Sequence, residues 1–114
     1  MSQTLFEKIV QRTVPADIVY ETDEVIGFRD IDPKAPVHVL VVPKKPIPDL
    51  GHATAHDSGV LGSLLLAAQA IALQEGVSET GYRLIINKGD DAGMAVPHLH
   101  VHLLGGRSFQ WPPG

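Results

Sequence analysis

Apolar residues recur along this chain with two periods, one of three to four residues and one of two. Thr4-Leu5-Phe6-Glu7 is a capping-box pattern, and the apolar residues that follow it predict a short helix over about residues 5–11. A longer stripe at helical spacing predicts the main helix over about residues 58–75, ended by Gly76. That stripe comprises Leu61, Leu64, Leu65, Ala68, Ile71 and Ala72.

The remaining apolar runs predict strands. Residues 18–21 and 25–29 are β-prone and flank a polar turn, so they predict a hairpin. Residues 37–42 and 82–87 predict two further strands, the first of them stopped by Pro43. Two consecutive strands at the end of the chain favour an antiparallel sheet over a βαβ arrangement. The sequence therefore predicts one α+β domain that spans residues 1–114.

Residues 96–104 carry the most specific pattern, Val-Pro-His-Leu-His-Val-His-Leu-Leu. On a strand, His98, His100 and His102 lie on one face, and the apolar residues between them lie on the other. The apolar face is typical of core, so the imidazoles are expected to line a site.

Three interpretations of these histidines are open from the residues alone. They belong to a half-buried strand, to a zinc site, or to a site in which a neutral imidazole attacks phosphorus. On a strand, the first and third side chains lie about 13 Å apart, so the three cannot share one ion. The chain has no cysteine, and Asp90 and Asp91 are the nearest acids.

Four other segments favour the third interpretation through a resemblance. Together with the histidine pattern, they resemble the purine-nucleoside phosphoramidase branch of the histidine-triad nucleotide-binding family. The segments are Phe28-Arg29-Asp30-Ile31, Ala35-Pro36-Val37-His38, Val42-Pro43-Lys44-Lys45 and Trp111-Pro112-Pro113-Gly114. The resemblance implies a five-stranded antiparallel sheet with one long and one short helix, paired into a homodimer. It also implies purine nucleotide binding and hydrolysis of a phosphorus–nitrogen bond with no metal or cofactor.

The resemblance also assigns roles to the four histidines. His100 is expected to be the nucleophile, with its other ring nitrogen held by the backbone carbonyl of His98. His38 is expected to steady the His98 ring, and His102 to donate to a phosphate oxygen.

The nucleotide-binding residues come from the same resemblance. Asp30 is expected to accept from both ribose hydroxyls. Phe28, Ile31, Leu5, Phe6 and Ile9 are expected to surround the base. Asn87 is expected to be a further polar contact to the nucleotide, and Gly93 and Ala95 to lie near the phosphate. From the residues alone, plain core packing explains the apolar positions, and a local turn explains Asp30 equally well. Ala95 stands where the best-studied branch carries a serine that assists the leaving group, and Pro97 where it carries a tyrosine.

Charge and composition exclude several other classes. The formal net charge is −4 with no long basic run, which argues against a nucleic-acid partner. We expect no membrane-spanning stretch, no signal peptide and, with no cysteine, a cytoplasmic protein. Two alternatives to the phosphoramidase stay open. One is a nucleotide-binding regulatory protein with little catalysis, and the other is an enzyme that cleaves dinucleoside polyphosphates or transfers nucleotidyl groups.

Overall fold

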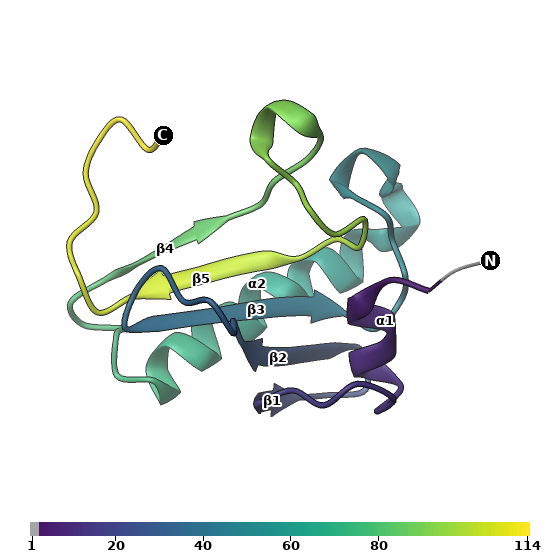
Figure 1. The fold of residues 1–114 in the computed structure, drawn as a ribbon, viewed down its shortest axis with the longest axis horizontal. Coiled ribbons are helices and arrows are strands. Elements are labelled where there is room, and N and C mark those ends of the chain that lie inside the picture. The colour runs from purple at the N-terminus through teal and green to yellow at the C-terminus, as the bar shows by residue number, and fades with distance from the viewer. Residues whose placement is uncertain (1–2) are drawn as a thin grey trace.

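Five strands form one antiparallel sheet in the order β1-β2-β3-β5-β4, as seen in the computed structural model of residues 3–114 (Figure 1). The strands are β1 (Ile18–Glu21), β2 (Val25–Arg29), β3 (Val37–Pro43), β4 (Tyr82–Ile85) and β5 (Val101–Gly105). The helices are α1 (Leu5–Val10) and α2 (Ser58–Gln74). The predicted α+β class, sheet and two helices are therefore confirmed, and the bounds of both helices and of β1 to β4 differ from the predicted ones by two residues at most.

The two helices lie on opposite faces of the sheet (Figure 1). The buried face of α2 packs on one sheet face, where Val39, Val41, Val101 and Leu103 are fully buried. On the other face, Phe6 of α1 packs in a smaller cluster with Phe28 of β2 and Leu40 of β3. The capping box at Thr4 and Glu7 is formed, so it fixes where α1 begins, close to the end of β3.

The predicted histidine strand is wrong at its beginning, because β5 starts only at Val101. The ladder between β3 and β5 ends at the pair Val41 and Val101. Before that pair, the Leu99 N–H donates to the Ile47 carbonyl at 2.7 Å, outside the sheet. The alternation of faces nevertheless holds, since Leu99 is buried in the same core cluster as Val101 and Leu103.

The expectation that no segment has the length and hydropathy of a membrane span is also wrong. The helical segment Ala55–Gln74 has 20 residues and a mean hydropathy of 1.2. Its apolar character has a structural reason, because one face of α2 forms the core against the sheet. The opposite face leaves Leu66 and Leu73 exposed.

Gly105 provides a test of how closely the sheet packs on the turn after α2. A Cβ at this position would lie 2.9 Å from the Cβ of Val77, which is buried and β-branched. We expect Gly105→Ala to lower the free energy of unfolding by about 1–3 kcal/mol, because a packed neighbour must move. Gly62→Ala is the matched control: its Cβ would meet nothing within 4 Å, and the change should stabilise α2 by up to about 1 kcal/mol. Urea titration of both variants measures the difference.

Candidate active site

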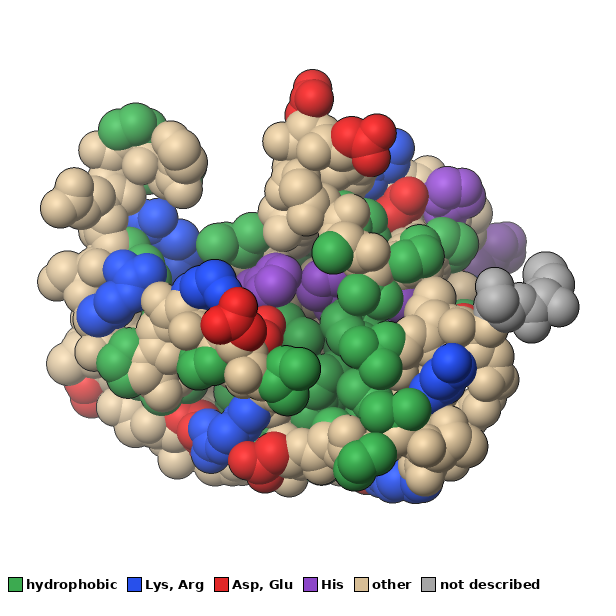
Figure 2. All heavy atoms as spheres, viewed as in Figure 1, with side chains coloured by type: hydrophobic (Ala, Val, Ile, Leu, Met, Phe, Trp, Pro, Cys, Tyr) green, Lys and Arg blue, Asp and Glu red, His purple; other side chains and the backbone are tan. Residues whose placement is uncertain are grey.

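Strand pairing brings His38 and His102 onto the sheet face that α1 partly covers. In the β3–β5 ladder, His38 lies opposite Leu104 and His102 lies opposite Leu40. Directly paired residues of an antiparallel ladder point to the same face, so both imidazoles emerge beside Leu40. His100 lies next to His102, with ring centroids 5.0 Å apart. Figure 2 shows the imidazoles together in the centre of this face, bordered by apolar side chains.

Two backbone carbonyls hold the rings of His98 and His100. The His98 Nε2 donates to the Pro43 carbonyl at 2.8 Å, and the His100 Nδ1 donates to the His98 carbonyl at 2.7 Å. A carbonyl only accepts, so each of these ring nitrogens carries the proton. In the neutral ring of His100, the lone pair is therefore on Nε2. The expected contact between the His100 ring and the His98 carbonyl is therefore present.

The expected contact between His38 and His98 is wrong. The His38 Nε2 lies 2.9 Å from the His102 Nδ1 instead. The two ring nitrogens of His98 face other groups: the Nε2 donates to the carbonyl of Pro43 at the end of β3, and the Nδ1 lies 3.4 Å from the Oγ1 of Thr4, the residue that caps α1. The expectation failed because the residue alternation gives the face of each histidine but not the register between the two strands, which pairs His38 with the neighbourhood of His102.

A backbone amide determines which nitrogen of His38 carries its proton. The Lys34 N–H donates to the His38 Nδ1 at 3.0 Å, so the proton of the neutral ring is on Nε2. That nitrogen donates to the His102 Nδ1, which leaves the proton of His102 on its own Nε2. His102 thus presents an N–H donor on the nitrogen that does not face His38.

Burial favours the neutral form of three of the rings, those of His38, His100 and His102. It lowers the pKa of His100, against the opposing effect of the His98 carbonyl. Burial, followed by the proximity of His100 and His38, lowers the pKa of His102 to about 4. Burial also lowers the pKa of His38, although the Asp30 carboxylate acts in the opposite direction. The site therefore combines an unprotonated ring nitrogen with a neutral N–H donor, rather than an imidazolium.

An apolar cavity of about 260 Å³ opens beside the histidines, between α1 and β2. Phe6 separates it from His100, with ring centroids 5.0 Å apart at an interplanar angle of 87°. Among the predicted base-contacting residues, Phe6, Ile9 and Phe28 are buried in its wall, while Leu5 and the 98 % exposed Ile31 lie at its rim. The other residues that line it are Val14, Pro15, Ala16, Arg29, Asp30, Leu40 and Val96.

Asp30 lies where the cavity meets the histidines. Its Oδ1 accepts the Asp32 N–H at 2.9 Å, which is the local turn contact that the residues alone suggested. Its Oδ2 lies 3.5 Å from the His38 Nε2. The carboxylate thus has one local bond and one oxygen turned toward the site.

Asn87, Gly93 and Ala95 lie outside the set of residues that line this cavity. Asn87 follows β4, and Gly93 ends the short turn Asp90–Ala92 with a φ of 74°. Ala95 lines a neighbouring hollow with Thr4, Leu5 and Pro97. The structure therefore places Ala95 beside α1 and leaves the roles of all three residues as predictions.

Four site features were missed in the sequence. Thr4 was identified only as a helix cap, and the backbone groups of Lys34 and Pro43 carry no side-chain signal. Leu40, in contrast, had a usable signal: it follows His38 by two residues in the same strand, so it lies on the same face.

A metal would have to compete with the hydrogen bonds already described. Donor atoms of Asp30, His38 and His102 lie within 4.8 Å of one another, which is a possible ligand set. However, a metal binds an unprotonated nitrogen. The Lys34 amide places the proton of His38 on Nε2, the nitrogen that faces the other two donors. The arrangement therefore suits a proton between the two rings better than a cation.

The alternating histidines 98, 100 and 102 on this α+β fold, with His38 beside His102, are typical of a histidine-triad protein. Residues 11–109 match the HIT domain, and the chain belongs to this family. A solved HIT family hydrolase from Legionella pneumophila is 46% identical, with a TM-score of 0.96 over 98% of this chain and 100% of that one. An adenylylsulfatase of Arabidopsis thaliana is 44% identical over 99% of this chain and 78% of its own length. A 14 kDa zinc-binding protein of Zea mays is 46% identical over 99% of this chain and 89% of its own length.

The neutral state of His102 gives a prediction about stability. The folded chain takes up this proton only near pH 4, whereas an unfolded histidine takes it up near 6.5. The free energy of unfolding should therefore fall as the pH is lowered from 6.5 to 4. We expect His102→Gln to reduce the slope of the free energy of unfolding against pH by an amount that corresponds to up to one proton. Urea titration at several pH values measures this slope. An equal slope in the variant and the wild type would contradict the burial of a neutral His102.

Proposed function

We propose that this HIT protein hydrolyses the phosphorus–nitrogen bond of purine nucleoside 5′-phosphoramidates through a nucleotidyl-His100 intermediate. One observation carries the proposal: the His100 Nδ1 donates to the His98 carbonyl at 2.7 Å, which leaves the Nε2 lone pair free for attack. The adjoining cavity supports a purine, because aromatic and aliphatic side chains line it and Asp30 stands at its edge.

In the first step, the Nε2 of His100 forms a bond to the α-phosphorus and the phosphorus–nitrogen bond breaks. The amine leaves with the electron pair of that bond and takes a proton from water. The His100 ring becomes cationic, and the His98 carbonyl that accepts its Nδ1–H stabilises this charge. His102 donates its Nε2–H to a phosphate oxygen, on which negative charge increases in the transition state.

In the second step, water attacks the phosphorus and the His100 Nε2 leaves with its electron pair. The products are the nucleoside 5′-monophosphate and a neutral His100, and the proton lost by the water goes to solvent. Asp30 is proposed to accept from the ribose hydroxyls through the oxygen turned toward the site. Asn87, Gly93 and Ala95 stay proposed contacts near the phosphate.

A second candidate substrate is a nucleoside 5′-phosphosulfate. Two observations favour it: the name of the Arabidopsis relative, and the side chain of Ala95, which has no hydroxyl to protonate a leaving group. Sulfate leaves as an anion and needs no proton, whereas an amine does. The loss of a donor at position 95 therefore slows the release of sulfate less than the release of an amine.

The test compares steady-state release of AMP from an adenosine 5′-phosphoramidate and from adenosine 5′-phosphosulfate, each with and without EDTA. We expect His100→Ala to reduce turnover by about 10⁴-fold or more while AMP binding is largely kept, because the imidazole that forms the bond is lost and the residues that line the cavity are unchanged. His56→Ala, at an exposed position, is the matched control. Substantial turnover by His100→Ala would refute the proposed nucleophile.

The EDTA arm separates the metal-free mechanism from a zinc-dependent one. Turnover that persists in EDTA supports the histidine nucleophile alone. If EDTA removes turnover and zinc restores it, this chain requires zinc, in line with the name of the maize relative. That result would contradict the proposal. AMP binding without release from either substrate would favour the nucleotide-binding protein.

We further propose that the protein is a homodimer, paired through β4 and the adjoining part of α2. β4 is an edge strand, and beside it an apolar cleft is lined by Leu50, Leu61, Leu65 and Ile86 among others. Trp111 is 82 % exposed and is available to a partner. The cytoplasmic location stays a prediction from the sequence.

Charge placed in this cleft tests the dimer. Ile86→Lys is expected to give a monomer in size-exclusion chromatography with light scattering, because it puts a charge in the cleft, directly after the end of the edge strand. Leu66→Lys is the control, since Leu66 is exposed on the part of α2 that faces Tyr20 and Val25 instead. A wild-type monomer, or an Ile86→Lys dimer of unchanged stability, would refute this interface.

A further inference from the structure

Arg107 lies beyond the end of β5, outside the cavity and the histidine cluster, yet it contacts the loop that positions His38. Its Nε donates to the Lys34 carbonyl at 3.1 Å. Lys34 is also the residue whose N–H donates to the His38 Nδ1 at 3.0 Å. One residue of the β2–β3 loop therefore connects an exposed guanidinium to a buried imidazole.

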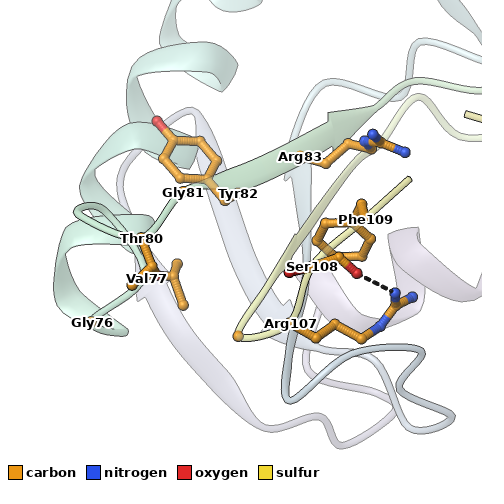
Figure 3. A pocket seen from close by; sticks show the side chains of 10 residues that line it. Gly76, Val77, Thr80, Gly81, Tyr82, Arg83, Arg107, Ser108 and Phe109 are labelled. Atoms are coloured by element: carbon orange, nitrogen blue, oxygen red, sulfur yellow. Dashed lines mark hydrogen bonds between the residues drawn. The ribbon is translucent and has the colours of Figure 1, made fainter. Parts of the chain in front are cut away.

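The guanidinium of Arg107 is held in place by its own surroundings. Its Nη1 donates to the Ser108 carbonyl at 3.1 Å, and its Cζ lies 4.3 Å from the centroid of the Phe109 ring (Figure 3). Arg83 lies beside the same ring at 5.3 Å and donates to the Gln110 carbonyl, but its described contacts do not include the β2–β3 loop. The two arginines therefore share the Phe109 ring and differ in the contact with Lys34.

The loop also packs against the residue that precedes Arg107. Gly106 has a φ of 90°, and a Cβ there would lie 2.9 Å from the Cβ of Pro36. Within the loop, the polar contacts are local: the Asp32 N–H donates to Asp30, and the Lys34 Nζ donates to Asp32. Arg107 adds a hydrogen bond from a residue that is 73 positions away in sequence.

We propose that Arg107 is a positioning residue for the histidine pair. By holding the Lys34 carbonyl, it keeps the Lys34 N–H on the His38 Nδ1. His38 then carries its proton on Nε2 and donates it to the His102 Nδ1, which keeps the His102 proton on the nitrogen that serves the substrate phosphate. The contact of His102 with a substrate phosphate rests on the proposed function, whereas the effect of Arg107 on the His38 and His102 rings does not.

Two substitutions of matched length isolate the Nε donor. Arg107→Gln places an amide nitrogen the same number of bonds from the backbone as the arginine Nε, and it removes the charge and the stacking group. Arg107→Met has a similar length and no donor. Arg83→Met is the control, because it removes the other guanidinium from Phe109 and leaves Lys34 untouched.

The first readouts are the hydrogen-exchange rate of the Lys34 amide and the imidazole ¹⁵N spectra of His38 and His102. In Arg107→Met we expect exchange at Lys34 to be roughly three- to tenfold faster, the range that the loss of one hydrogen bond implies. The His38 Nδ1 resonance should also move toward a mixture of tautomers. Arg107→Gln and Arg83→Met should both match the wild type.

Two results would overturn the proposal. One is wild-type exchange and wild-type ¹⁵N spectra in folded Arg107→Met. The other is an equal change in Arg107→Gln and Arg107→Met, which would assign the effect to charge or stacking instead of the Nε donor. If Arg107→Met does not fold, the Gln variant decides, because the loss of the wild-type spectra in a folded Arg107→Gln contradicts the donor route and their retention supports it.

Turnover gives a separate readout. Where the wild type releases AMP, Arg107→Met should lower kcat with little change in KM, and Arg107→Gln should restore kcat. If the wild type releases none, the proposed function fails while the exchange and ¹⁵N measurements still decide the role of Arg107.

Discussion

Antiparallel pairing between β3 and β5 sets His38 opposite Leu104 and His102 opposite Leu40. The same register turns Val39, Val41 and Val101 to the other face, where they are buried under α2. The core and the histidine cluster are thus two faces of one ladder. A shift of one residue would exchange them, placing imidazoles against α2 and valines beside the cavity. Burial of the apolar face therefore maintains the geometry of the polar one.

Backbone groups, more than acidic side chains, set the protonation of the four rings. Carbonyls of Pro43 and His98 hold His98 and His100, and the amide of Lys34 holds His38. A neutral imidazole both donates and accepts, so fixing one nitrogen determines the other. Because burial lowers the pKa values of His38, His100 and His102, the neutral forms of these three rings are favoured, and adjacent rings avoid the repulsion of adjacent charges.

The cavity joins this cluster to α1, a helix of only six residues. Its Thr4 caps the helix by accepting the Glu7 N–H, and the same hydroxyl lies beside the His98 Nδ1. Phe6, two residues further along the chain, contacts His100 and Phe28. A short helix has little stability of its own, so α1 depends on these contacts. The wall of the cavity and the ring of His98 are therefore ordered together.

Local pattern alone determined the two helices, the strands and the alternation of faces in residues 96–104, because periodicity reports which side chains are buried together. The family resemblance added the expectation that His38 acts together with the three histidines of that segment. The pairing of His38 with His102 instead of His98, and the start of β5 at Val101, were decided by strand register and by where the ladder ends. The tautomers of the histidine rings could not be predicted from the sequence either. They depend on the Lys34 amide and the carbonyls of Pro43 and His98, backbone groups that every residue type carries and that only the folded chain can aim.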